Sequence, residues 1–203
     1  MKNIAINIGR QLATGGLEIG KYLAKQLNYN FYDKAIIRLI AVKSGMSPEF
    51  LDDYDERSQV TSGFLSALSV NALFYDNNYL LDQSISNFFT DTIIKLSKES
   101  NSVFVGRCAD YILKDRAECF NVFLYAPLDF RMEILKSRLK DKSNNEIKKI
   151  IKNTDKSRAA YYNRYTDKKW GDPNSYNLMI DTSTYGIKKT SELLYNYVKD
   201  FTI

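Results

Sequence analysis

The chain opens with an apolar run, a glycine-containing turn and a helical segment, and this arrangement constrains its fold more than any other feature. Residues 3–8 read NIAINI, which is typical of a short buried strand, and the turn of residues 9–16 follows directly. Leu17, Leu23 and Leu27 then recur near one face of a helix. A strand, a glycine turn and a helix in this order indicate the start of an α/β unit.

The alternation of strands and helices continues along the chain. Apolar segments predict further strands at residues 30–32, 102–107, 119–127 and 176–183, and periodic segments predict helices at residues 34–45, 79–99, 128–141, 144–163 and 186–200. Ser47 and Pro48 predict one more short helix, and the path of residues 57–78 stays open. This order favours a mostly parallel sheet with helices on both faces. We expect a single domain over residues 1–203.

The composition excludes several classes of site. The 203 residues include no histidine, so histidine triads, histidine bases and histidine metal ligands are excluded. The two cysteines, Cys108 and Cys119, are too few for a four-cysteine zinc site and suit a reducing compartment. No apolar run approaches the ~20 residues that span a bilayer, and residues 1–9 are too short for a signal peptide. We therefore expect a cytoplasmic protein without a membrane partner.

Positive charge is concentrated in one part of the chain. Residues 131–169 contain 13 basic and 5 acidic residues, a net charge of +8, whereas the whole chain carries +5. The remainder must therefore sum to −3. A basic segment of this kind indicates a partner that carries phosphate. A solvated lysine-rich helix face explains the lysines equally well.

The first turn is a candidate phosphate site because parallel α/β sheets bind ligands at the carboxyl ends of their strands. Its amides and the following helix N-terminus would attract an anion. The turn departs from the P-loop pattern GxxxxGK followed by Ser or Thr. Counted from Gly9, Thr14 and Gly15 stand where Gly-Lys would be. Taken alone, a glycine turn without a ligand is an equally good interpretation.

Motifs spread over almost the whole chain resemble the cytidylate kinase-like family, a divergent branch of the P-loop nucleoside monophosphate kinases. The turn and the segments around it resemble the REYGSGGREIG loop of that family followed by FYD and a helix. The segments that carry the resemblance are GRQLATGGLEIGKYLAKQLNYNFYDKAIIRLIA at 9–41, FVGRCADYIL at 104–113, APLDFR at 126–131, DKSRAAYYNRYTDKKWGD at 155–172 and YNLMIDTSTYG at 176–186.

The resemblance implies a P-loop kinase-like three-layer α/β sandwich. Its sheet would have five strands, and residues 131–170 would form a helical lid. The implied reaction moves the γ-phosphoryl group of ATP to a nucleoside monophosphate, with CMP or dCMP as the favoured acceptor. ATP and Mg²⁺ would be the cofactors, with metal ligands left unknown. Phosphoryl transfer depends mainly on positioning and cations, so a chain without histidine can perform it.

On the donor side, the resemblance implies that the turn holds the ATP phosphates. Arg10 would supply the positive charge of the missing P-loop lysine, with a surface arginine as the alternative. Glu18 would bind the metal through water or simply favour the first helical turn. The implied nucleotide-binding residues are Gly9, Ala13, Thr14, Gly15, Gly16, Leu17 and Glu18.

On the acceptor side, Asp33 and Arg38 match in spacing the Asp-x-x-x-x-Arg pair of the cytidylate kinases. Arg38 would hold the acceptor phosphate, and Asp33 would orient it or cap its own helix. Arg107 resembles the arginine of the family's Asp-Gly-Arg motif, in which Val105 here replaces the aspartate. Asp110 is a possible substitute for that carboxylate.

In the lid, Arg131 matches the lid-entry arginine of the family, and Asp155 with Arg158 matches its Asp-x-x-Arg pair. The pair would approach the substrates, or would form a modest intrahelical ion pair. With Arg10, these residues form the implied catalytic set. Further lid or base-stacking candidates, which core packing and solvation explain as well, are Tyr161, Tyr162, Arg164, Tyr165, Lys168, Lys169 and Trp170. The strand-end segment 181–183 would support the adenine side.

Three departures from the family remove charge from the phosphoryl site: the absent lysine, Val105, and Leu17 where arginine is common. A catalytically weak or inactive nucleotide-binding regulatory protein is therefore the alternative function. We do not expect nucleic acid as a partner, because no RNA-binding aromatic motif accompanies the basic segment. The oligomeric state stays open.

Overall fold

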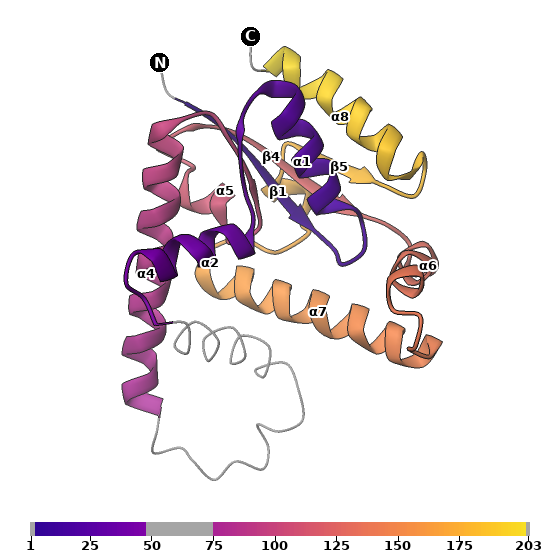
Figure 1. Cartoon of the computed structure of the whole chain (residues 1–203), viewed down its shortest axis with the longest axis horizontal. Coiled ribbons are helices and arrows are strands. Elements are labelled where there is room, and N and C mark those ends of the chain that lie inside the picture. Colours follow the sequence, from indigo (N-terminus) through magenta and orange to yellow (C-terminus); the bar gives the residue numbers. More distant parts are fainter. Residues whose placement is uncertain (1–2, 48–74, 202–203) are drawn as a thin grey trace.

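The sheet has five parallel strands in the order β2-β3-β1-β4-β5 (Figure 1). The computed structural model describes residues 3–47 and 75–201. All five predicted strands are confirmed, and each pairs in parallel with its neighbours. Their bounds are Ile4–Arg10 (β1), Asn30–Tyr32 (β2), Ser102–Val105 (β3), Glu118–Tyr125 (β4) and Leu178–Asp181 (β5).

The predicted helices are also present, with ends that differ by a few residues. Their bounds are Gly16–Leu27 (α1), Lys34–Lys43 (α2), Tyr75–Glu99 (α4), Leu128–Arg138 (α6), Asn144–Tyr165 (α7) and Gly186–Phe201 (α8). A one-turn helix at Ala109–Ile112 (α5) and a 3₁₀ turn at Pro173–Ser175 (η3) were not predicted, because neither is long enough to show a helical period. The helix predicted to start at Ser47-Pro48 and residues 57–74 fall outside the described residues.

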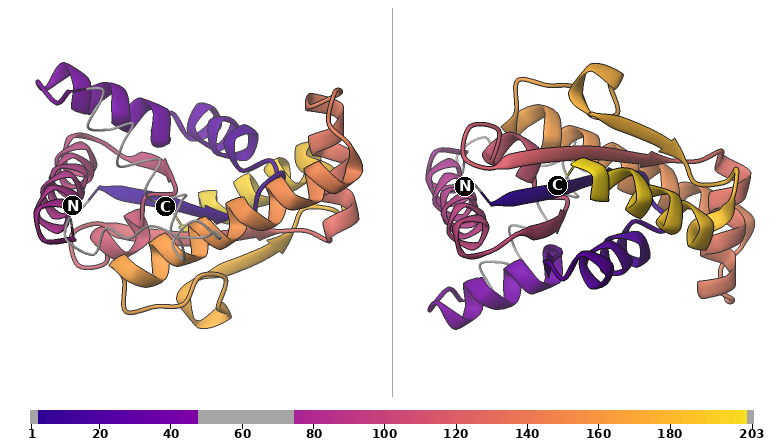
Figure 2. Two further views of the ribbon diagram at one scale, coloured as in Figure 1. Left: turned by 90° about the horizontal axis from the view of Figure 1, so that it is seen from below. Right: turned by 90° about the horizontal axis from the view of Figure 1, so that it is seen from above.

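Helices cover both faces of the sheet, as predicted. Along β1, Ala5 packs with α2, α4 and α5, whereas Ile6 and Ile8 pack with α1 and α8. This alternation follows from the two-residue period of a strand. Figures 1 and 2 show α4 and α6 on opposite sides of the molecule, with the strands between them.

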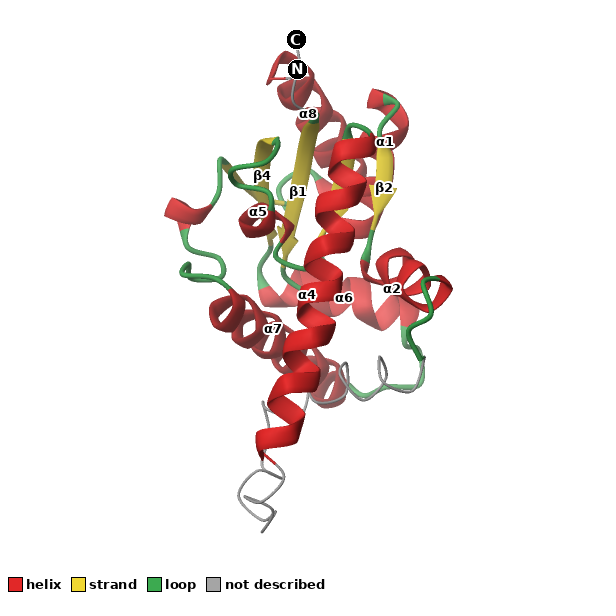
Figure 3. Ribbon diagram, turned by 90° about the vertical axis from the view of Figure 1, so that its left-hand side faces the viewer, coloured by secondary structure: helices red, strands yellow, loops and turns green. Residues whose placement is uncertain are grey.

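The carboxyl ends of the strands point toward helices α2, α6 and α7. Figure 3 shows the strands running toward the level at which α2, α6 and α7 lie. The turns that follow β1, β2 and β3 therefore meet at one edge of the sheet. This edge is where a parallel α/β fold places its ligands.

A third apolar cluster joins the first turn to helices α6 and α7. Ala13 packs with Leu135 of α6 and with Ile147 and Ile151 of α7, and Leu12 lies against the same group. The turn after β1 is thus held by helices that come more than 100 residues later in the sequence.

Leu194 tests the core on the α8 side of the sheet. Its side chain is fully buried, whereas the neighbouring Leu193 is 46% exposed. We expect Leu194→Ala to lower the free energy of unfolding by about 2–5 kcal/mol because it leaves a cavity. Leu193→Ala is the matched control and should cost far less. Urea unfolding of both variants checks this, and equal losses would contradict the packing described here.

Candidate functional site

The turn between β1 and α1 is anchored at its first half to the end of β4. The amide of Gln11 donates to the carbonyl of Leu124 at 3.0 Å, and the amide of Ala126 donates to Gln11 Oε1 at 3.2 Å. The hydroxyl of Thr14 donates back to the Gln11 carbonyl at 2.9 Å. Gln11 therefore fixes the conformation of the first half of the turn. The sequence motifs did not identify this residue.

The second half of the turn exposes backbone donors that have no partner. Ala13 and Gly15 are buried, and their amides have no hydrogen-bond acceptor within residues 3–47 and 75–201. The amide of Thr14 closes the turn of residues 12–13 toward the Gln11 carbonyl. Buried amides are almost always paired in folded proteins. Their grouping at the start of α1 creates a seat for an anion.

Gly15 gives the turn its shape. It is the N-cap of α1 with φ of +78°, in the left-handed region that favours glycine. A Cβ atom at this position would lie 2.7 Å from the side chain of Ile187. A side chain at residue 15 would therefore strain the backbone and collide with α8.

Arg10 spans the site from the turn to the end of β3. A Cβ atom on Gly16 would lie 2.9 Å from Arg10 Cγ, so the arginine stem runs across the first residue of α1. The guanidinium group contacts Gly106, immediately after β3. Burial is the main cause that lowers the Arg10 pKa to about 9, and the positive charges of Arg158 and Arg107 contribute in the same direction. The carboxylate of Asp33 opposes this shift.

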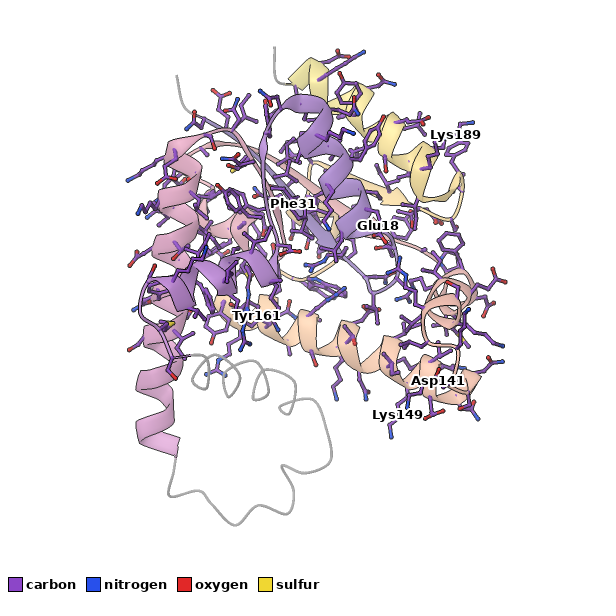
Figure 4. All side chains as sticks on the ribbon, viewed as in Figure 1. Glu18, Phe31, Asp141, Lys149, Tyr161 and Lys189 are labelled. Carbon is purple, nitrogen blue, oxygen red and sulfur yellow. The ribbon has the colours of Figure 1, made fainter. Side chains whose placement is uncertain are left out.

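The turn after β3 is strained and carries Arg107. Gly106, Arg107 and Cys108 all have positive φ, at 84°, 61° and 55°. Non-glycine residues rarely adopt such angles, and clusters of them are typical of functional sites. The guanidinium carbon of Arg107 lies 4.6 Å from the ring centroid of Phe89 and 5.8 Å from that of Tyr161. Figure 4 shows Tyr161 at the end of α7 nearer α4.

Asp33 and Arg38 both belong to the start of α2, at the carboxyl end of β2. Asp33 is the N-cap of α2 and accepts from the amide of Ile36 at 2.9 Å. The capping function predicted for it is therefore present. Arg38 is half-buried on the same helix. Asp33 also acts electrostatically on Arg10, which connects the acceptor side to the turn.

Asp110 points into the protein interior. Its carboxylate accepts a hydrogen bond of 2.6 Å from the Tyr162 hydroxyl of α7, and the residue is buried. Burial raises the pKa of Asp110, while the Tyr162 bond and Lys168 act in the opposite direction. Burial and the Asp110 charge likewise raise the pKa of Tyr162. The bond thereby attaches the segment after β3 to helix α7.

The catalytic candidates of the lid are also in contact with the turn. Asp155 accepts from the amide of Leu12 at 2.7 Å and forms an ion pair with Arg131. Arg158 donates to the carbonyl of Arg10 at 3.1 Å. Burial lowers the Arg158 pKa, and Asp155 raises it. The structure therefore brings together three of the predicted site arginines, Arg10, Arg107 and Arg158. Arg131 instead forms its ion pair with Asp155.

Glu18 forms an exposed ion pair with Arg138 at the end of α6. Figure 4 shows Glu18 at the start of α1. The pair links α1 to α6, and this contact could not be predicted from local sequence patterns because 120 residues separate the partners. Leu17 beside it is 43% exposed.

No group of three or more acidic, cysteine or histidine side chains within residues 3–47 and 75–201 is arranged to hold a metal ion. The carboxylates of Asp33, Asp110, Asp155 and Glu18 each have the protein partner described above.

The aromatic candidates lie in packed clusters. Phe123 packs edge-on against Trp170 and also contacts Tyr176, and Tyr161 packs against Tyr165. At the end of β5, Asp181 accepts from the amide and hydroxyl of Ser183.

In the part of the chain that the structure describes, none of the helices combines the length and apolar character needed to cross a bilayer.

The strand order, the turn after β1 and the arginines at its edge define a P-loop kinase-like protein. The sequence profile of the cytidylate kinase-like family matches residues 5–184. The chain belongs to that family, as the motifs indicated.

Solved structures with the same fold include an uncharacterized protein from Eubacterium ventriosum ATCC 27560. It is 24% identical with a TM-score of 0.72, and the match covers 97% of this chain and 99% of that one. A shikimate kinase from Bacteroides thetaiotaomicron is 14% identical with a TM-score of 0.55, covering 97% and 98%. A gluconokinase from Sinorhizobium meliloti 1021 is 11% identical with a TM-score of 0.51, covering 98% and 95%. No curated protein matches the sequence.

Asp110 should impose a pH dependence on stability. The pKa of Asp110 is raised in the folded state above the ordinary value of 3.8. The contribution of Asp110 to the free energy of unfolding is therefore fully present below pH 3.8, and it is lost as the pH rises through the folded-state pKa. Asp110→Asn keeps an uncharged side chain at every pH. The free energy of unfolding of this variant, minus that of the wild type, should therefore increase with pH. Urea titrations at several pH values measure this difference, and a constant or falling difference would contradict the assignment.

Proposed function

We propose that this protein transfers the γ-phosphoryl group of ATP to a nucleoside monophosphate, with CMP or dCMP as the favoured acceptor. The observation that carries the proposal is the path of Arg10. Its side chain passes Gly16 at the start of α1 and ends at Gly106, and the charges of Arg107 and Arg158 act on its guanidinium group. The turn and the acceptor side thus share one cluster of positive charge.

The charge cluster favours a phosphate-rich ligand. Arg158 and Arg107 both repel the buried guanidinium group of Arg10, and the carboxylate of Asp33 partly offsets the lowering of the Arg10 pKa. An anion with several negative oxygens would relieve this repulsion and satisfy the loop amides at the same time. Planar guanidinium groups match phosphate oxygens in two-point contacts.

In this reaction the protein would position the two substrates and stabilise the negative charge on the transferring phosphoryl group. The amides of Ala13, Thr14 and Gly15 would hold the donor phosphates, together with Gly9, Gly16, Leu17 and Glu18 of the same segment. Arg10 would stand between donor and acceptor, where charge builds on the transferring group. It would take over the task that a lysine performs in a standard P-loop.

The acceptor would lie at the carboxyl ends of β2 and β3. Asp33, Arg38 and Arg107 come from this side, and Arg158 approaches from α7. Magnesium, when bound with ATP, would neutralise phosphate charge. The described side chains provide no set of ligands for it, so its ligands would come from the substrates and water.

A second function has a specific observation in its favour. The turn contains no lysine, and Glu18 is engaged by Arg138. A protein that binds nucleotide without turning it over, in a regulatory capacity, would need only the anion seat and the arginines. Either function fits a cytoplasmic protein, because both cysteines are free thiols.

The proposed reaction is tested by a steady-state assay with ATP, magnesium and a panel of nucleoside and deoxynucleoside monophosphates. We expect turnover with a pyrimidine monophosphate. Calorimetry with the same nucleotides separates the two functions. Binding without turnover supports the regulatory function, and absence of both binding and turnover contradicts both.

Arg10→Ala should lower kcat by roughly 10²–10³-fold, because a cation that stabilises the transition state is lost. Arg10→Lys should recover part of the rate, since it restores a charge without the planar group. Arg116, an exposed arginine bonded to the carbonyl of Ile112, gives the matched control Arg116→Ala. A kcat for Arg10→Ala equal to that of Arg116→Ala would remove Arg10 from the mechanism.

Arg38→Ala and Arg107→Ala should raise the KM for the acceptor by about tenfold or more, or abolish turnover, because each removes a phosphate-binding fork. The KM for ATP should change much less. Thermal unfolding confirms that each variant is folded. If both variants keep the wild-type KM for the acceptor, the pocket lies elsewhere.

A further inference from the structure

Asp155 uses both oxygen atoms of its carboxylate within the protein. Oδ1 accepts from the amide of Leu12 at 2.7 Å, and Oδ2 pairs with Arg131 Nη1. The side chains of Arg131 and Asp155 are only 9% and 15% exposed. A carboxylate with both oxygens occupied in this way has little capacity left for a substrate hydroxyl or base.

Arg131 depends on this pair. It lies in the first turn of α6, where its amide donates to the carbonyl of Pro127, and it is buried. Its Nε atom has no hydrogen-bond acceptor within the described ranges 3–47 and 75–201. Removing one partner of a buried pair leaves the other charge uncompensated. Asp155 therefore ties the junction of β4 and α6 to helix α7.

Helix α7 contacts the phosphate-binding turn at three successive places. Arg158 donates to the carbonyl of Arg10, Asp155 accepts from the amide of Leu12, and Ile147 and Ile151 pack with Ala13. Helix α7 thus holds residues 10–13, which adjoin the unpartnered amides of the turn. Donors fixed before the ligand arrives bind it at a lower entropic cost.

We infer that Asp155 is a positioning residue: it holds the phosphate-binding turn through the Leu12 amide and does not bind substrate itself. This inference rests on the proposed function in one respect, namely that the turn binds phosphate. It gives helix α7 a structural function in the donor site, which is to hold the turn in place. It departs from the substrate-facing function that the family resemblance implied for this residue.

The test compares Asp155→Ala and Asp155→Asn with Asp141→Asn. The alanine variant removes both contacts, whereas the asparagine variant keeps an oxygen that can accept from Leu12. Asp141 is an exposed carboxylate in the connection between α6 and α7, far from Tyr161 along α7 (Figure 4). It is the control for the loss of one negative charge in the lid.

The first readout is hydrogen exchange of residues 11–16, which requires neither ligand nor turnover. Exchange should be faster in Asp155→Ala than in the wild type, with Asp155→Asn in between and Asp141→Asn unchanged. Equal exchange in all four proteins overturns the inference. If Asp155→Ala does not fold, the comparison of Asp155→Asn with the wild type decides in the same way.

The second readout is pyrophosphate binding, with the KM values for ATP and for the acceptor. Asp155→Ala should weaken pyrophosphate binding by about tenfold and raise the KM for ATP similarly, which corresponds to one lost charge-assisted hydrogen bond. The KM for the acceptor should stay within about twofold. A raised acceptor KM with unchanged pyrophosphate affinity overturns the inference, because Asp155 would then be a substrate ligand. A wild-type protein that binds no pyrophosphate contradicts the proposed function instead, and the exchange data then decide on Asp155 alone.

Discussion

The structure depends on one constraint: the turn after β1 must keep buried backbone donors open while its neighbours hold it in place. The amides of Ala13 and Gly15 have no acceptor within the described part of the chain. Gln11, Asp155 and Arg158 fix the residues immediately before them. A turn without these anchors could rotate its amides to internal acceptors, and the anion seat would close.

Positive charge completes the site from three separate parts of the chain. Arg10 comes from the end of β1, Arg107 from the strained turn after β3 and Arg158 from α7. The burial of Arg10 and its repulsion by Arg158 and Arg107 have a cost in the absence of ligand, as the lowered pKa of Arg10 indicates. Apolar packing of α6 and α7 against Ala13 offsets part of that cost. In the proposed function, Arg10 would take the place of the absent P-loop lysine from the end of β1.

Much of the fold could be predicted from the sequence because periodicity and glycine turns are local signals. The strands, the principal helices and the capping function of Asp33 follow from residues close together in the chain. Contacts such as Asp155 with Leu12, or Glu18 with Arg138, could not be predicted, since they depend on how α6 and α7 pack on the turn. Asp110 illustrates the same limit: nearness to Arg107 made it a candidate, but its carboxylate is bonded to Tyr162 inside the protein. As site assignments, these residues stay predictions.

The most direct test of the central claim is a crystal structure of the protein with ADP and CMP bound. The account predicts phosphate oxygens within hydrogen-bonding distance of the amides of residues 13–15, with the guanidinium groups of Arg10, Arg107 and Arg158 directed at the same phosphates. Phosphates bound away from the turn, with those arginines directed elsewhere, would contradict it.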